Sequence, residues 1–148
     1  MDDLNVINAL RLLQSAEELR ARLAGEFSSV HGISVNEFFL LMQLRNAPKQ
    51  RLSRTELAKR MHVSASTVTR MVAPMEKIGM VDRMIDDRDA RLAFVVLTSA
   101  GQDRLSEALA TFAKQAGYAF QDRWTDAEMK QFSALLFRLV AGTPANLT

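Results

Sequence analysis

Residues 53–79 read SRTELAKRMHVSASTVTRMVAPMEKIG, and this stretch decides the fold. Ser53 and Glu56 have the spacing of a capping box, which predicts the start of a short helix. Ser64 is a suitable N-cap for a following helix that we expect to extend to Ile78. Because only about three residues separate the two helices, the spacing predicts a helix-turn-helix.

The second of these helices has two dissimilar faces when its residues are placed at about 100° intervals. The face predicted to lie in the core carries Val68, Met71, Val72, Met75 and Ile78. The opposite face is small, polar and basic, and it carries Ser66, Thr69, Arg70, Ala73 and Lys77. Such a face fits a major groove roughly 12 Å wide, although a solvated surface helix can look the same. Its place directly after the helix-turn-helix spacing favours DNA binding.

A hairpin follows this helix. Residues 80–85 and 92–97 are rich in apolar and β-branched side chains, and the charged run 86–91 separates them. This pattern predicts two strands joined by a charged tip, with residues 51–53 as a third strand at the edge. The combination of a helix-turn-helix and a hairpin predicts a winged helix-turn-helix, in a mainly α chain with a small β wing.

Long helical segments flank this unit on both sides. Apolar residues at steps of three and four predict one helix over 2–30 and another over 98–121. Capping boxes predict two further helices, after Ser34 and after Thr125. The first helix, the helix over 98–121 and the last helix have more apolar surface than one small domain covers, so we expect these three to form a dimer interface; packing within a monomer is the alternative. The predicted single domain, 1–148, thus has dimerisation helices at 2–33 and 98–142 around a DNA-binding region at 34–97.

Several residues in the helix-turn-helix are candidates for contact with DNA. Ser66, Thr67 and Arg70 lie in the first half of the second helix, where recognition helices meet base edges. An arginine at this point can donate two hydrogen bonds to guanine O6 and N7. Ser64 and the free N–H groups of the first turn suit a phosphate. The remaining helix residues predicted to bind DNA are Thr69, Lys77 and Arg54.

The predicted hairpin tip supplies a second set of candidates. An arginine at such a tip can enter a narrow, electronegative minor groove, which makes Arg88 and Arg91 candidates for DNA binding. Asp89 lies between them and repels phosphate, so we expect it to pair with Arg91 and to determine the shape of the wing. For Arg88, a solvated charge is an equal alternative.

Residues 52–101 resemble the multiple antibiotic resistance regulator (MarR) family. The likeness runs through LSRTELA at 52–58, VSASTVTRMV at 63–72 and EKIGMVDR at 76–83, and ends with Asp89-x-Arg91 and the Leu97-Thr98-x-x-Gly101 motif. The resemblance implies a homodimer whose terminal helices interlock and which binds pseudo-palindromic operators, usually to repress transcription. It also implies release by a small aromatic or anionic ligand. One departure concerns the wing, where Ala90 replaces the first arginine of the family's usual Asp-Arg-Arg.

Composition agrees with this interpretation and excludes others. Residues 45–91 hold eleven Lys or Arg and six Asp or Glu, while the rest of the chain is net acidic, so the middle third is the part that suits a polyanion. No cysteine, cofactor motif, metal-ligand spacing or catalytic set is present in the sequence, so we expect no enzyme, no cofactor and no metal site. The acidic first residues and the lack of a long apolar run predict a cytoplasmic protein.

Some residues keep two interpretations. His31 and His62 are expected to be turn residues, with titration near neutral pH a further role for His31. Met42 and the pair Phe38-Phe39 belong either to the core, which we favour, or to a ligand pocket near the dimer junction. A winged-helix protein-interaction module without DNA binding is the alternative function.

Overall fold

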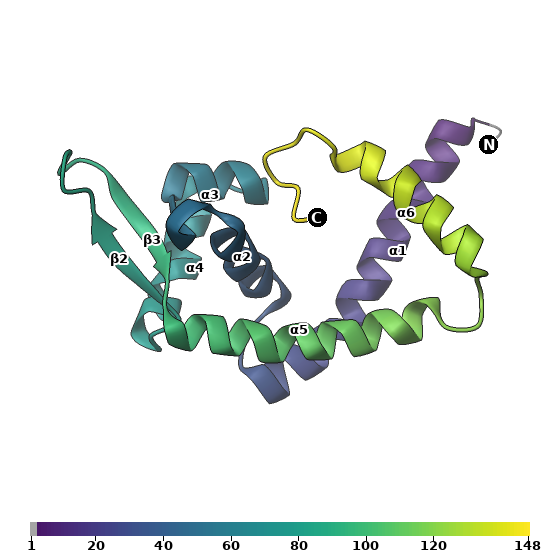
Figure 1. Ribbon diagram of the computed structural model, residues 1–148, viewed down its shortest axis with the longest axis horizontal. Helices are drawn as coiled ribbons and strands as arrows, with labels where there is room; N and C mark the ends of the chain where they lie inside the picture. The colour runs from purple at the N-terminus through teal and green to yellow at the C-terminus, as the bar shows by residue number, and fades with distance from the viewer. Residues whose placement is uncertain (1–2) are drawn as a thin grey trace.

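The computed structural model describes residues 3–148 and consists of a winged-helix region and a helical arm, joined by one long helix, α5 (Figure 1). The helices are α1 (Leu4–Glu26), α2 (Val35–Asn46), α3 (Arg54–Met61), α4 (Ala65–Lys77), α5 (Ser99–Phe120) and α6 (Asp126–Val140). The strands are β1 (Arg51–Ser53), β2 (Val81–Ile85) and β3 (Ala93–Leu97). A π-helical turn (Phe27–His31) continues α1, and a 3-10 turn (Pro48–Gln50) precedes β1. The mainly helical class with a small wing is thereby confirmed; Asp2, the predicted start of the first helix, lies outside the described residues.

The caps anticipated in the sequence are present at the helix starts. The hydroxyls of Ser34 and Thr125 accept from the backbone N–H groups of Glu37 and Glu128, whose carboxylates accept in return. Ser53 makes only its half of the third box. The Glu56 carboxylate instead lies 3.6 Å from Arg60 Nε, one turn further along α3.

The turn between α3 and α4 is as tight as the sequence predicts. His62 adopts a left-handed conformation with φ of 56°, and its N–H donates to the carbonyls at the end of α3. Ser64 then caps α4 by accepting from the backbone N–H of Thr67. Gly79 follows the end of α4 with φ of +78°, a conformation that favours glycine. The predicted helix-turn-helix is confirmed.

The wing is an antiparallel sheet of three strands in the order β1-β3-β2. Val81 pairs with Leu97 and Ile85 with Ala93, so β2 and β3 form the predicted hairpin. The short strand β1 pairs with the other edge of β3, with Leu52 opposite Val95. The edge strand predicted at 51–53 is therefore present, and β3 becomes the central strand.

Helix α5 begins in close contact with the wing. Thr98 caps α5 through Gly101 N–H, and its hydroxyl also donates to the Met80 carbonyl. A Cβ placed at Gly101 would lie 2.0 Å from the Met80 carbonyl oxygen. Because no side chain fits at that distance, a glycine at this position allows α5 to start directly against β2.

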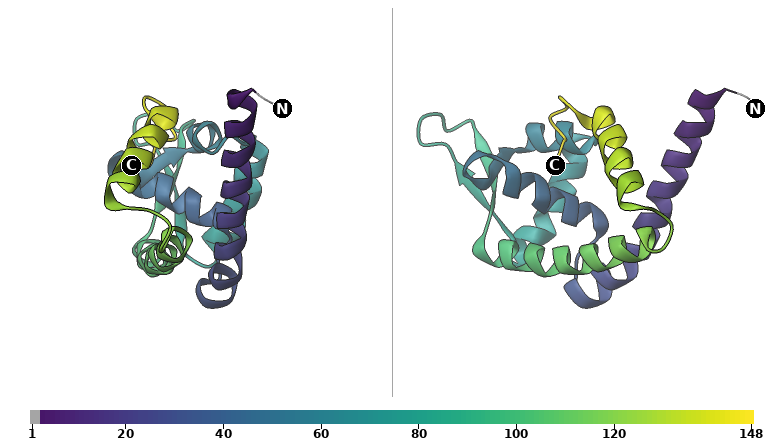
Figure 2. Two further views of the ribbon diagram at one scale, coloured as in Figure 1. Left: turned by 90° about the vertical axis from the view of Figure 1, so that its right-hand side faces the viewer. Right: turned by 45° about the vertical axis from the view of Figure 1, so that its right-hand side comes forward.

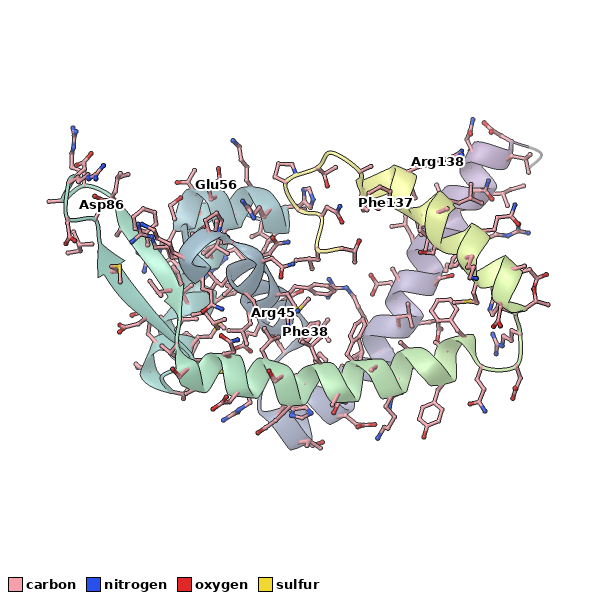
Figure 3. All side chains as sticks on the ribbon, viewed as in Figure 1. Phe38, Arg45, Glu56, Asp86, Phe137 and Arg138 are labelled. Carbon is pink, nitrogen blue, oxygen red and sulfur yellow. The ribbon has the colours of Figure 1, made fainter. Side chains whose placement is uncertain are left out.

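The hydrophobic core lies inside the winged-helix region and at its junction with α1 and α5. Phe38 lies between α2 and α5 (Figure 3), with its ring centroid 5.0 Å from that of Phe27 and 5.4 Å from that of Phe112. On α4, Val68, Val72 and Met75 are fully buried and Met71 is half-buried.

The sequence predicts Ile78 on the same core face of α4, and this prediction is wrong. The helix ends at this residue, so the side chain turns away from the core and remains 59% exposed.

His31 is not a solvated turn residue, although the chain does turn there. The residue is 6% exposed at the end of the π-helical turn, and its Nε2 lies 2.7 Å from Thr111 Oγ1 on α5. Its backbone carbonyl accepts a hydrogen bond from Arg104, also on α5. The extra residue of a π-helical turn rotates the last side chains of α1 relative to α-helical periodicity. His31 therefore packs at the joint between α1 and α5.

The arm contains α1, the C-terminal part of α5, and α6. Figure 2 shows the N-terminal end of α1 standing away from the winged-helix region. No residue of α6 is buried, although the helix is amphipathic. The large exposed apolar side chains of α1 and α6 are Leu4, Val6, Leu10, Leu12, Leu13, Leu135, Phe137, Leu139 and Val140. Among residues 3–148, no helix is long and apolar enough to cross a membrane.

The segment after α6 returns to the winged-helix region. The buried side chain of Gln43 donates to the Ala145 carbonyl at 3.0 Å, and Asn46 Nδ2 donates to the Leu147 carbonyl at 3.1 Å. Residues 144–147 thus lie along α2 (Figure 1), a contact that no sequence pattern had indicated.

Candidate nucleic-acid interface

Helix α4 exposes the face that the sequence marks as polar and basic. Ser66, Thr69, Arg70, Ala73 and Lys77 are all exposed, and the opposite face is buried against the core. The small side chains before Arg70 leave the backbone of the helix accessible, as close approach to base edges requires. The structure therefore places these predicted residues on one accessible surface.

The first two turns of α4 carry a connected group of hydroxyls. Ser64 Oγ lies 2.9 Å from both Ser66 Oγ and Thr67 Oγ1. Arg70 Nη2 donates to Thr67 Oγ1 at 3.3 Å. The Thr69 hydroxyl donates to the Ala65 carbonyl at 3.1 Å. Thr67 is half-buried, so it lies below the accessible surface that its neighbours form.

Arg54 lies apart from this surface. Its Nη2 lies 3.8 Å from Glu76 Oε1, and the side chain is only about a third exposed. The pair connects the start of α3 to the end of α4, which is a structural contact between the two helices. Arg54 remains a predicted phosphate contact, but its guanidinium is already directed at a carboxylate. Lys77 is exposed at the end of α4.

The hairpin tip is shaped by two aspartates. Asp86, labelled at the end of the hairpin in Figure 3, accepts from the backbone N–H groups of Arg88 and Asp89 at 2.7 and 3.2 Å. Asp89 accepts from Arg91 Nε at 3.1 Å, from Arg91 Nη2 at 3.3 Å and from the Arg91 backbone N–H at 3.0 Å. These bonds, led by the one from the Arg91 side chain, lower the pKa of Asp89 below its ordinary value of 3.8. The predicted pairing of Asp89 with Arg91 is present.

The two wing arginines differ in their surroundings. Arg91 is 90% exposed, yet Asp89 holds its guanidinium and neutralises part of its charge. Arg88 is exposed beside Asp87. The tip thus presents two guanidinium groups at the far end of the hairpin, and only Arg91 is oriented by an ion pair.

A cavity of about 360 Å³ lies between α1, α2 and α5. Its lining is largely apolar and includes Leu19, Leu23, Val35, Phe39, Phe112 and Phe120. The guanidinium of Arg20 lies 5.5 Å from the centroid of the Phe39 ring, and Arg20 Nη1 donates to Asn36 Oδ1. For three residues the sequence allows two interpretations. Phe39 lines this cavity, whereas Phe38 is buried in the core and Met42 packs against the core.

Sequence reasoning missed the positions that complete this cavity. Phe112 and Phe120 belong to the apolar periodicity that predicts the helix over 98–121, and this periodicity does not indicate that they meet α1 and α2. Nothing in the sequence distinguishes Arg20 from the other two arginines of the same long amphipathic helix. In the part of the chain that the structure describes, no group of three or more His, Asp or Glu residues is placed to hold a metal ion.

Residues 33–92 match the model of the MarR family. The chain is 35% identical over 106 residues to the HTH-type transcriptional repressor YetL of Bacillus subtilis; the match covers 71% of this chain and 62% of YetL. The chain thus spans about three fifths of that curated relative.

Solved structures resemble the whole described fold. The MarR family transcriptional regulator Sco3205 from Streptomyces coelicolor, determined in complex with DNA, is 28% identical with a TM-score of 0.76, over 91% of this chain and 84% of Sco3205. A mutant MarR from E. coli complexed with operator DNA is 23% identical with a TM-score of 0.75, over 94% of this chain and 99% of that protein. The second likeness shows the winged-helix fold alone.

Proposed function

The chain belongs to the MarR family of transcriptional regulators, and from this premise we propose that it binds double-stranded DNA sequence-specifically as a homodimer and represses transcription. The observation that carries the proposal is the exposed face of α4, which is small, polar and basic within the region that matches the family. Sco3205, which is 28% identical to this chain, was determined in complex with DNA, and this supports DNA binding as the function.

Within this function, α4 is the recognition helix and the hairpin is a secondary contact. Arg70 reads a guanine in the major groove, and the free N–H groups of the first turn after Ser64 bind a phosphate. Arg91 and Arg88 reach toward the minor groove. Ala90, at the tip between them, offers no charge, so we assign the wing a smaller share of the affinity than the helix.

The homodimer part of the proposal rests on the arm. The apolar side chains of α1 and α6 are exposed in the single chain, which is unfavourable unless another surface covers them. A second copy brings two recognition helices to successive half-sites of a pseudo-palindromic operator. The proposal keeps the division into dimerisation helices at 2–33 and 98–142 and a DNA-binding region at 34–97.

The ligand part rests on the cavity between α1, α2 and α5. Its largely apolar lining, with the Arg20 guanidinium at Phe39, suits a small aromatic or anionic molecule. Because the cavity lies between the arm and the winged-helix region, a bound molecule would change their relative position and release the operator. A panel of aromatic carboxylates is tested for release of the operator from wild type and from Phe39→Ala. A compound that releases the operator equally from both proteins binds outside this cavity.

The deciding experiment is selection of bound fragments from random duplex DNA, followed by titration of the selected operator and a scrambled duplex at several salt concentrations. We expect binding that weakens steeply with salt. Arg70→Ala should lower the affinity for the operator about 5- to 100-fold and change the affinity for the scrambled duplex little. Arg22→Ala, an exposed arginine on α1, is the matched control. Absent or salt-independent duplex binding would refute the proposal and favour a winged-helix protein-interaction module.

A further inference from the structure

The hydroxyl group of Ser64 takes part in as many hydrogen bonds as a serine can make. Its Oγ accepts from the backbone N–H of Thr67 at 3.1 Å and lies 2.9 Å from both Ser66 Oγ and Thr67 Oγ1. A hydroxyl has one hydrogen to donate and two lone pairs to accept with. One lone pair is used by the N–H group, so Ser64 must accept from one of the two neighbouring hydroxyls and donate to the other.

Arg70 decides between the two possible orders. A guanidinium has only donors, so Thr67 Oγ1 accepts from Arg70 Nη2. If Ser64 also donated to Thr67, the Thr67 hydrogen would have no partner at a half-buried position. In the other order Thr67 donates to Ser64 and Ser64 donates to Ser66, and the one unused hydrogen lies on the exposed Ser66. The positive charge of Arg70 polarises the chain in the same direction.

The hydroxyl of Thr69, on the same exposed face as Ser66, is available to DNA as an acceptor rather than as a donor. Its hydroxyl hydrogen is donated to the Ala65 carbonyl of the preceding turn at 3.1 Å. Only lone pairs of this oxygen are left to face outward. The exposed surface of α4 therefore offers donors at Ser66 and Arg70 and an acceptor at Thr69.

We propose that Thr67 does not contact a base but positions Arg70 and, through Ser64, makes Ser66 a hydrogen-bond donor toward DNA, while Thr69 is an acceptor. This inference rests on the proposed function, since it assigns roles within the recognition helix. Ser66 then pairs with a DNA acceptor, which is a purine N7, a guanine O6, a thymine O4 or a phosphate oxygen. Thr69 pairs with the exocyclic amino group of adenine or cytosine.

The positioning of Arg70 has a physical benefit. An arginine side chain loses considerable rotamer freedom when it is fixed against a base, and a guanidinium already held by Thr67 loses less. The bond to Thr67 uses one of the five N–H donors, so four remain for a guanine. Removal of the Thr67 hydroxyl should therefore lower discrimination at the guanine that Arg70 reads, without removing any DNA contact.

The test uses the full-length protein and its selected operator. Acceptors are removed singly by 7-deazapurines, by 2-aminopurine in place of guanine, by 5-methyl-2-pyrimidinone in place of thymine, or by methylphosphonates in the backbone. We expect one such change to weaken operator binding by the wild-type protein about 5-fold, which corresponds to one neutral hydrogen bond, and to leave binding by Ser66→Ala almost unchanged. Coupling of Ser66 to an amino group, or to no position, would overturn its donor role.

Thr67→Val, which keeps the side-chain shape, tests positioning. It should reduce discrimination at the Arg70 guanine several-fold and weaken the Ser66 coupling, while Thr67→Ser restores both and affinity for scrambled duplex stays unchanged. Wild-type discrimination in Thr67→Val would refute the inference. If Thr67→Val fails to fold, the coupling between Ser66 and the DNA acceptor, measured with Ser66→Ala and Thr67→Ser, still tests the donor role of Ser66. Absence of any selected operator would instead refute the proposed function, so the two failures are distinguishable.

Discussion

The winged-helix region and the arm are built from similar amphipathic helices, but they bury very different amounts of their apolar surface. In the winged-helix region Phe38, Val68 and Met75 are fully or almost fully buried. In the arm, α6 has no buried residue and Phe137 is 49% exposed (Figure 3). Helices α3 and α4 pack against each other, and α2 packs against α3 and α5, whereas α1 meets the rest of the chain chiefly through α5.

This difference indicates which part of the molecule is complete in one chain. The winged-helix region has a buried core, to which α1 and α5 contribute at the junction, so one chain orients α4 and the hairpin. The arm has a hydrophobic face that the described residues do not cover, and its stability is expected to depend on protein concentration. The four predictions that follow test this contrast, from the largest expected effect to the smallest.

The core should be the part most sensitive to truncation. Phe38→Ala removes a ring that packs against Phe27 and Phe112, and we expect it to lower the free energy of unfolding by about 3–5 kcal/mol. Guanidinium denaturation followed by circular dichroism measures the change. Phe38→Leu keeps most of the volume and should cost less than about 1.5 kcal/mol. Equal effects of the two variants would contradict a tightly packed site.

Substitutions in the arm should weaken the association of two copies and leave the folding of the winged-helix region unchanged. The double variant Leu135→Asp, Leu139→Asp places two carboxylates on one face of α6, and we expect the dimer dissociation constant to rise at least about 100-fold. Analytical ultracentrifugation measures it. The control Leu135→Met, Leu139→Met keeps the face apolar and should remain dimeric. An unchanged dissociation constant in the aspartate variant would place the interface elsewhere.

The joint between the two regions should show an intermediate effect. Thr111→Val removes the partner of His31 Nε2, and His31 Nδ1 is buried without a hydrogen-bond partner. The imidazole is then left with neither nitrogen paired, which should cost about 1–3 kcal/mol of unfolding free energy. Thr111→Ser retains the hydroxyl and should lose much less. The idea fails if the valine and serine variants are equally stable.

The hairpin tip should show the smallest effect, because polar contacts rather than a core hold it. The pKa of Asp89 is lowered by Arg91, so the Asp89–Arg91 contact is fully present above pH 3.8 and is lost as the pH falls through the lower folded-state value. The NMR shift of the Arg91 backbone N–H, which donates to Asp89, should report this titration. Asp89→Asn should abolish it. An inflection above pH 3.8 would contradict the lowered pKa.

Features that depend on neighbouring residues were predictable from the sequence. The caps at Ser34, Ser64 and Thr125, and the left-handed Gly79, involve partners within four positions along the chain. The polar face of α4 followed from helical periodicity for the same reason.

Features that depend on which elements meet in space were not predictable in this way. Ile78 has core periodicity, but the helix ends at it and the side chain is exposed. The sequence favours a core position for Phe39, and only the approach of α5 to α1 and α2 makes it a cavity wall. Gln43 is polar in an apolar helix, and its partner, Ala145, lies far along the chain.

The sequence by itself determined the helix-turn-helix, the hairpin and the small basic face of α4, because caps, turns and periodicity act over a few residues. Tertiary structure decided the burial of His31, the cavity at Phe39 and the uncovered face of α6. It also decided that Thr67 lies below the surface of α4, where it meets Arg70 rather than solvent. Burial depends on the packing of segments that are distant in sequence, and no local pattern encodes which of them meet.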